Sequence, residues 1–375
     1  MPKTYLLLDN NINNFKKNSK LIFFDEYSKN LIEKKKIKNY QTKFLLTFKD
    51  LRSFNYNSNL LNKKIKNYVN LLKDQFNHIH TKNHDEKYWS LILDRILYLI
   101  INGILFELNT LKKIKKNRDR IIIKNIKFND YFIDTADFIS NYENNLIQPY
   151  IRFCVAKNLG FKQEQLPFST KTKKNQSIKK NFLSSIFNFH NYISVLFRLY
   201  SSIFKPFLVL DGYIPKKSCL KIFFKSFGRI LIIPSSFFFA ERNYSGKKNL
   251  FIRKTLRVKE KDVIDKIFND IFPHFLPSSY LENFKVYDSY SNSFKSLSKV
   301  GTAVSLIYND YFKYMAAAIL KMKGKVLVFQ HGGLIGKLQY DRDEAFNQKY
   351  ASKVYSWIGN THFSENYFEK FKKIQ

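Results

Sequence analysis

The chain has 375 residues, of which 45% are hydrophobic and 17% aromatic, a composition that can build a buried core and excludes an intrinsically disordered protein. Lys and Arg number 65 against 30 for Asp and Glu, which leaves a formal net charge of +35. The basic residues are spread along the chain rather than clustered, so we expect no specific nucleic-acid binding, whereas loose peripheral contact with an anionic membrane stays an alternative.

The N-terminal residues 1–11 contain too short an apolar run for a signal peptide. No later run approaches the ~20 apolar residues that a membrane-spanning helix requires. The two cysteines, Cys154 and Cys219, are far apart and fit neither a disulfide framework nor a metal-ligand spacing. We therefore expect a cytoplasmic protein, at most peripheral at the inner face of the membrane.

Short apolar runs alternate along the chain with longer stretches of helical periodicity, which is typical of an α/β fold. Several of these runs are apolar on both faces, as in strands of a covered parallel sheet. The sequence thus predicts a Rossmann-like parallel sheet flanked by helices, with additional helical segments. In chain order, the predicted strands are 21–24, 44–46, 121–123, 207–210, 229–233, 301–306 and 325–329.

Two long helices are predicted in the first half of the chain. Apolar residues step by three and four from Leu61 to Ile79, and Ser58 could cap that helix. A second helical pattern runs from about Tyr88 to Leu111. Residues 162–181 are polar and basic and are predicted to form a loop or linker. We therefore predict an N-terminal α/β region with long helices at 1–165 and a Rossmann-like region at 182–360.

A glycine-rich turn follows the last of the predicted strands. Gln330 and His331 come directly after the strand, and the glycines of the turn are Gly332, Gly333 and Gly336. Ligands of α/β sheets bind at the carboxyl ends of strands, and backbone N–H groups of a glycine turn can cradle a phosphate. His331, with an ordinary pKa of ~6.5, suits a general base. The alternative is a tight turn whose histidine only hydrogen-bonds the backbone.

Residues 330–357 resemble a family of bacterial transferases found among surface-polysaccharide genes, which carries a QHGG-x-x-G turn, an acidic helix and a strand ending in Ser-Trp. The matching positions are Gln330, His331, Gly332, Gly333, Gly336, Glu344, Ser356 and Trp357. Further matches follow in the same order along the chain, namely Asn77, His80, Tyr88 and Trp89; Thr135, Asp137, Phe138, Asn144 and Asn145; Pro277, Tyr280, Leu281 and Glu282; and Phe312, Lys313 and Ala316.

The chain departs from the family pattern at several positions. Lys87 stands where the family has Arg, and 94–96 stand where it has Gly-Pro-Trp. Asn347 replaces a second acidic residue, and Ser352 replaces an Asp before the last strand. These departures predict reduced activity.

The resemblance implies the layout of a two-domain glycosyltransferase of the GT-B kind, of which this chain would be the N-terminal half. Residues 361–375 would then begin an absent C-terminal donor domain. The implied function is transfer of a sugar or related group from a nucleotide-activated donor to a surface-glycan acceptor. It implies no metal and no cofactor besides the activated sugar. It assigns catalysis to His331 and Glu344, and substrate or phosphate binding to Gln330, Gly332, Gly333, Gly336, Lys313, His80, Lys87, Tyr88 and Trp89.

Alternatives stay open for the whole chain and for single residues. The chain could be a non-catalytic acceptor-domain remnant, the partner of a separately encoded C-terminal half, or a basic nucleic-acid binder. Tyr88 and Trp89 could belong to the core, and Lys313 could be a solvated lysine. A metal site among His78, His80 and His84 is disfavoured, because the first two lie on different helix faces.

Overall fold

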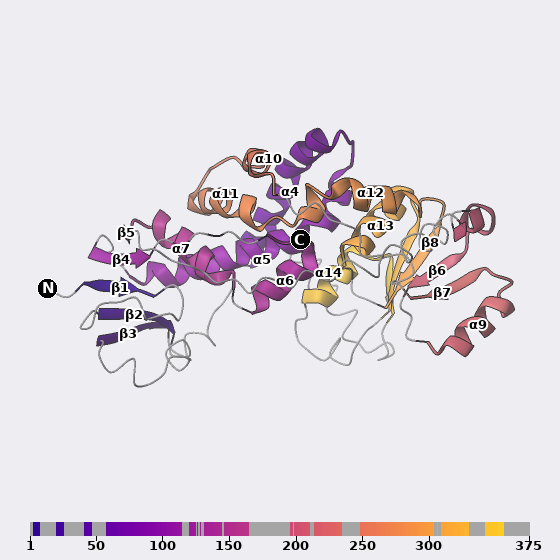
Figure 1. Ribbon diagram of the computed structural model, residues 1–375, viewed down its shortest axis with the longest axis horizontal. Helices are drawn as coiled ribbons and strands as arrows, with labels where there is room; N and C mark the ends of the chain where they lie inside the picture. The colour runs from indigo at the N-terminus through magenta and orange to yellow at the C-terminus, as the bar shows by residue number, and fades with distance from the viewer. Residues whose placement is uncertain are drawn as a thin grey trace, which may run out of the picture.

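The computed structural model describes most of the chain, with gaps. The described residues are 3–7, 20–25, 41–46, 58–114, 120–124, 126, 128, 131–144, 146–164, 196–197, 199–210, 214–234, 248–303, 306, 309–329 and 342–355. They form two parallel sheets, called here sheet A and sheet B, at opposite ends of the long axis, with helices between them (Figure 1).

Sheet A has the order β3-β2-β1-β4-β5, and every pair of neighbours is parallel. Its strands are β1 (Thr4–Leu6), β2 (Lys20–Asp25), β3 (Gln41–Leu46), β4 (Ile121–Lys124) and β5 (Lys162–Glu164). Residues 162–164, predicted as part of a loop, instead pair with β4 as an edge strand. Two of its three side chains are exposed and the third is only partly buried, so the polar Lys-Gln-Glu sequence carries no apolar signal of a strand.

Sheet B has the order β10-β9-β8-β6-β7 and is also parallel throughout. Its strands are β6 (Phe207–Leu210), β7 (Ile230–Ile233), β8 (Lys299–Thr302), β9 (Lys325–Phe329) and β10 (Lys353–Tyr355). The strand ending at Phe329 is interior, between β8 and β10, while β8 is the middle strand. A Cβ at Gly301 would lie 2.7 Å from the Phe329 ring, so only glycine fits this crossing of aromatic rings.

Between the sheets lies a helical layer whose centre is α5 (Glu86–Lys112), a helix buried along nearly its whole length. A helix that is apolar all round needs partners on every side. Those in contact with it are α4 (Ser58–His80), α7 (Gln148–Asn158), α11 (Val263–Phe275) and α13 (Asp310–Lys321). The remaining helical elements are α6 (Thr135–Glu143), α9 (Lys216–Lys225), α10 (Leu250–Thr255), η3 (Ser278–Tyr280), α12 (Phe284–Asn292) and α14 (Arg342–Tyr350).

The predicted α/β class with parallel, Rossmann-like sheets and flanking helices is confirmed. Both long helices are present, and α5 begins where Asp85 accepts a hydrogen bond from Tyr88 N at 2.8 Å. The strand predicted at 301–306 lies at 299–302 instead. The region boundaries at 165 and 182 stay predictions, although helices from the second half of the chain pack on α5 and α7 of the first. No helix in the described part of the chain is long and apolar enough to cross a bilayer.

Candidate functional site

The glycine turn falls outside the described residues, so the roles predicted for Gln330, His331, Gly332, Gly333 and Gly336 stay predictions. The structure does show the end of the strand that precedes them. Strand β9 ends at Phe329, and parallel pairing with β8 puts that end at the carboxyl edge of sheet B. Glu344 belongs to α14, and its side chain lies outside the described atoms. The prediction that Glu344 supports catalysis also stays a prediction.

A buried polar cluster lies at the start of α13, which follows the carboxyl end of β8. At its centre is Lys313, which has no exposed surface. Its Nζ donates to Thr135 Oγ1 at 2.8 Å and to Tyr280 Oη at 3.0 Å, and it lies 3.2 Å from Asp310 Oδ1. Burial lowers the pKa of Lys313, whereas the Asp310 carboxylate opposes that shift.

Asp310 joins this cluster to two other segments. Its Oδ2 accepts hydrogen bonds from Thr135 N at 3.0 Å and from Ser279 Oγ at 2.5 Å, and its Oδ1 accepts one from Thr135 Oγ1. The cluster thus ties α6, η3 and α13 together. Three sequence blocks of the family pattern, those containing Thr135, Tyr280 and Lys313, meet here. The alternative of a solvated Lys313 is wrong, because these three oxygen partners surround its buried amine. The contact of Lys313 with a phosphate stays a prediction.

Asp134 lies at the rim of the same cluster, and sequence reasoning missed it. Its carboxylate accepts from Asp137 N at 2.9 Å and so caps α6. Burial, together with the charge of Asp310, raises the pKa of Asp134 to about 6. A carboxyl group that titrates near neutrality is a candidate for proton transfer. The one feature of the sequence that could have indicated Asp134 is its position directly before Thr135, the first of the family matches in that region.

Asp134→Asn should make the stability of the protein less sensitive to pH. Because the folded-state pKa lies above the ordinary 3.8, ionisation of Asp134 destabilises the fold as pH rises from 3.8 through 6. Asn keeps the helix cap and removes the charge. We expect the variant to be more stable by about 3 kcal/mol above pH 6 and no more stable near pH 3.8. Urea midpoints of both proteins across this pH range measure the difference in stability. A gain in stability that is the same at every pH would contradict a raised pKa of Asp134.

A second cluster brings together the early family positions. Asn77 Oδ1 accepts from Trp89 Nε1 at 2.9 Å and from His84 N at 3.0 Å, which fixes the turn between α4 and α5. Trp89 and Tyr88 are buried, at 0% and 3% exposure, so both rings belong to the core. Lys87, in contrast, is exposed on the surface of α5. Binding of a substrate by these residues stays a prediction.

His80 is held by two contacts. Its ring stacks on Phe284 with centroids 3.8 Å apart, and its Nε2 lies 3.0 Å from the Tyr280 carbonyl oxygen. Because a carbonyl only accepts, Nε2 must carry the proton, which leaves the Nδ1 lone pair as an acceptor. Burial lowers the pKa of His80 to about 4, so the ring is neutral at pH 7.

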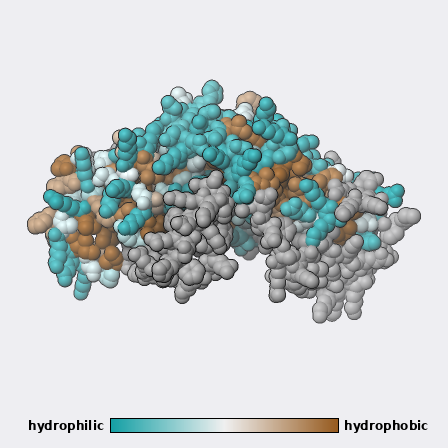
Figure 2. Space-filling model, turned by 180° about the vertical axis from the view of Figure 1, so that it is seen from behind, coloured by the Kyte–Doolittle hydropathy of each residue, from teal (hydrophilic) through white to brown (hydrophobic). Residues whose placement is uncertain are grey.

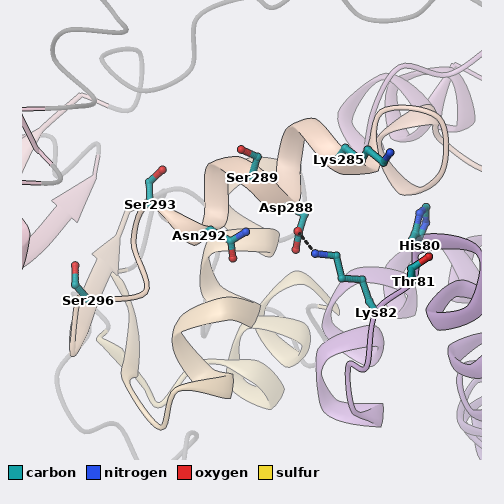
Figure 3. Close-up of a pocket in the computed structure, with 9 residues that line it drawn as sticks. All are labelled: His80, Thr81, Lys82, Lys285, Asp288, Ser289, Asn292, Ser293 and Ser296. Carbon is teal, nitrogen blue, oxygen red and sulfur yellow. Dashed lines mark hydrogen bonds and ion pairs between the residues drawn. The ribbon is translucent and has the colours of Figure 1, made fainter.

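A pocket of about 700 Å³ opens beside His80, between the end of α4 and one side of α12 (Figure 3). Lys82 pairs with Asp288 across it at 2.7 Å, and His84 Nε2 lies 3.8 Å from the same carboxylate. The remaining lining is rich in hydroxyl, amide and amine groups, from Thr81, Lys285, Ser289, Asn292, Ser293 and Ser296. Such a lining suits a hydrophilic ligand that carries hydroxyl or anionic groups.

The pocket and the end of β9 lie at different edges of sheet B. Ser293 and Ser296 precede β8, so the pocket is near the amino edge of the sheet, whereas β9 ends with Phe329 at the carboxyl edge. Helix α13 runs between the two edges, and its 12 residues span ~18 Å. Tyr280 contacts both the pocket residue His80 and the buried cluster, because its carbonyl oxygen is a hydrogen-bond partner of His80 and its hydroxyl accepts from Lys313. The pocket beside His80 is therefore separated from the end of β9, after which the sequence of the predicted glycine turn follows.

Three residues that depart from the family pattern make hydrogen bonds to other segments of the chain. Asp94 Oδ2 accepts from Lys349 Nζ at 2.9 Å and from Tyr350 Oη at 2.8 Å, which ties α5 to α14. Asn347 Oδ1 accepts from Leu306 N at 3.1 Å, and Ser352 Oγ accepts from Val326 N at 3.0 Å. Asp94 and Asn347 thus hold α14 in place, and Ser352 bonds β9. Within the described residues, no group of His, Cys, Asp or Glu has a geometry suited to a metal ion.

Comparison with known proteins gives one match. A family model described as LIC12162 family transferase matches residues 4–370, which is nearly the whole chain. No curated protein and no solved structure matches the chain.

Proposed function

Because the chain belongs to the LIC12162 family of transferases, we propose that it moves a sugar or a related group from a nucleotide-activated donor to a hydroxyl of a surface glycan. In this reaction the acceptor oxygen bonds to the transferred carbon, and the bond from that carbon to the nucleoside phosphate breaks. The acceptor proton goes to a base, and the nucleotide leaves with its phosphates. The proposed place of this chemistry is the cytoplasm, where activated sugars are made.

The observation that carries the proposal is the topology of sheet B. Its strand order reverses between β6 and β8, and the adjacent β9 leads directly into Gln330 and the glycine turn. Ligands of open α/β sheets bind outside the carboxyl ends of strands at such a reversal. We propose that N–H groups of the turn hold the donor phosphates and that His331 takes the acceptor proton. Glu344, from α14, is proposed to support His331.

The pocket beside His80 is proposed to hold a part of the acceptor remote from the reacting hydroxyl. Because the pocket lies near the amino edge of sheet B, it is proposed to have no direct part in bond formation. Lys285 and Ser289 of α12, with Ser293 and Ser296 after it, offer hydrogen bonds to sugar hydroxyls and to acidic substituents. Binding at remote positions can still promote the reaction, because it orients the acceptor.

Incubation of the purified chain with a panel of nucleotide sugars and oligosaccharide acceptors tests the proposal. We expect release of a nucleoside phosphate that depends on the acceptor, together with a matching mass increase of the glycan. Mass spectrometry of the acceptor and a coupled nucleotide assay measure the two products. Release of nucleotide that is equal with and without acceptor indicates hydrolysis and contradicts the proposal, as does the absence of turnover across the panel.

A further inference from the structure

Large apolar side chains are exposed at one end of the molecule. More than half of the strongly exposed large hydrophobic residues of the described chain fall between residues 196 and 227. They are Leu196, Leu199, Ile203, Phe204, Ile214, Leu220, Phe224 and Phe227, called here the apolar patch. Phe224 is 70% exposed and Phe227 is 88% exposed. Single exposed hydrophobic residues are ordinary, but a gathering of this kind marks an interaction site.

The two segments that carry the patch lie side by side. Residues 199–204 precede β6, and α9 with its following turn precedes β7. Since β6 and β7 are parallel neighbours, the segments that precede them meet at the amino edge of sheet B. Phe207 N donates to Arg229 O at 2.8 Å, and Tyr200 Oη donates to Gly228 O. Figure 2, in which this end lies at the left, shows brown surface beside teal there.

Helix α9 makes little use of its apolar residues for folding. None of its ten residues is buried, although it contains Leu220, Phe223 and Phe224. Phe227, in the turn after it, has a φ of 52°, a left-handed conformation that is unfavourable for a bulky residue. An aromatic side chain that is both strained and exposed contributes nothing to the core. Its location is therefore better explained by a contact outside the chain.

The charges around the apolar patch define the kind of partner. Six exposed cationic side chains surround it, namely Lys205, Lys216, Lys217, Lys221, Lys225 and Arg229. The described residues from 199 to 210 and from 214 to 234 include no Asp or Glu. Apolar groups mixed with cations and without anions complement a bilayer of anionic lipids, where rings enter the interface and amines meet phosphates. A protein partner would more often meet a patch with charges of both signs at its rim.

We propose that the apolar patch docks this protein on a membrane surface that contains anionic lipid. Phe224 and Phe227 enter the boundary between headgroups and acyl chains, and the lysines of α9 contact the lipid phosphates. Residues 199–204, Phe224 and Phe227 lie at the amino edge of β6 and β7, whereas Ile214 and the start of α9 follow the carboxyl end of β6. This inference does not depend on the proposed transfer reaction.

Vesicle co-sedimentation of the full chain tests the inference. We expect binding to vesicles of phosphatidylcholine mixed with phosphatidylglycerol, weakened by salt, and little binding to phosphatidylcholine alone. The double variant Phe224→Ser/Phe227→Ser should lower the partition coefficient about tenfold or more, because two buried rings are lost. Lys217→Glu/Lys221→Glu should remove the preference for anionic lipid. Both variants should keep the urea midpoint of the wild type, since these side chains are exposed.

The matched controls come from α10 and its neighbourhood. Phe251 is 83% exposed there, and Phe251→Ser should leave vesicle binding unchanged, as should Lys254→Glu. Equal binding of wild type and the Phe224/Phe227 variant, or binding to neither kind of vesicle, would overturn the inference. A dimer in solution that the same variant dissociates, without vesicle binding, would assign the patch to a contact between copies of this chain.

Discussion

Replacing Lys313 with Met is expected to destabilise the fold by about 3–5 kcal/mol, the usual cost of removing one partner from a buried ion pair. Met fills a similar volume, so the loss reports charge and hydrogen bonding rather than a cavity. Without the amine, the Asp310 carboxylate keeps its buried position but loses its cation, and the hydroxyls of Thr135 and Tyr280 lose a donor. Urea unfolding measures the change as a shift in midpoint at constant m value.

Lys321→Met is the matched control, because Lys321 lies on the same helix but is exposed. Its bond to Asn83 O at 3.0 Å is at the surface, so we expect a change under about 1 kcal/mol. Thr135→Val offers a milder test of the same cluster if the Lys313 variant does not fold. A loss for Lys313→Met no larger than that for Lys321→Met would show that the cluster does not hold α6, η3 and α13 together.

His331→Ala is expected to lower kcat by roughly two to four orders of magnitude on a donor and acceptor pair that supports transfer, as removal of a positioned general base does. The urea midpoint should stay that of the wild type, since the residue follows the end of β9 and is predicted from the sequence to belong to a glycine turn. The acid limb of the pH profile of kcat/KM, near the ordinary His pKa of ~6.5, should disappear as well.

His78→Ala is the control for this experiment. His78 lies on α4, is exposed and does not line the pocket, so its loss should leave kcat within about twofold. Unchanged turnover and an unchanged acid limb in a folded His331→Ala protein would assign the histidine a structural role. Asp134, with its pKa raised to about 6, would then become the leading candidate for the base.

Local periodicity predicted much of the secondary structure. The step of three and four from Leu61 to Ile79 is sufficient to identify α4, because a helix must place its apolar residues on one face. Runs such as 207–210 and 325–329 were recognisable as strands, because strands covered on both faces are apolar throughout. The polar edge strand β5 was missed for the opposite reason, since its three side chains are mostly exposed and give no apolar pattern.

The amino-acid sequence by itself determined the fold class, the two long helices, most strands and the membership of a transferase family, because each depends on residue types at fixed spacing. Only the tertiary structure decided which residues meet. It buried Lys313 among Thr135, Tyr280 and Asp310, raised the pKa of Asp134, and put the pocket beside His80 and the end of β9 at opposite edges of sheet B. These relations depend on packing between segments that are far apart in the chain, where burial and neighbouring charges, rather than local spacing, fix the chemistry of a side chain.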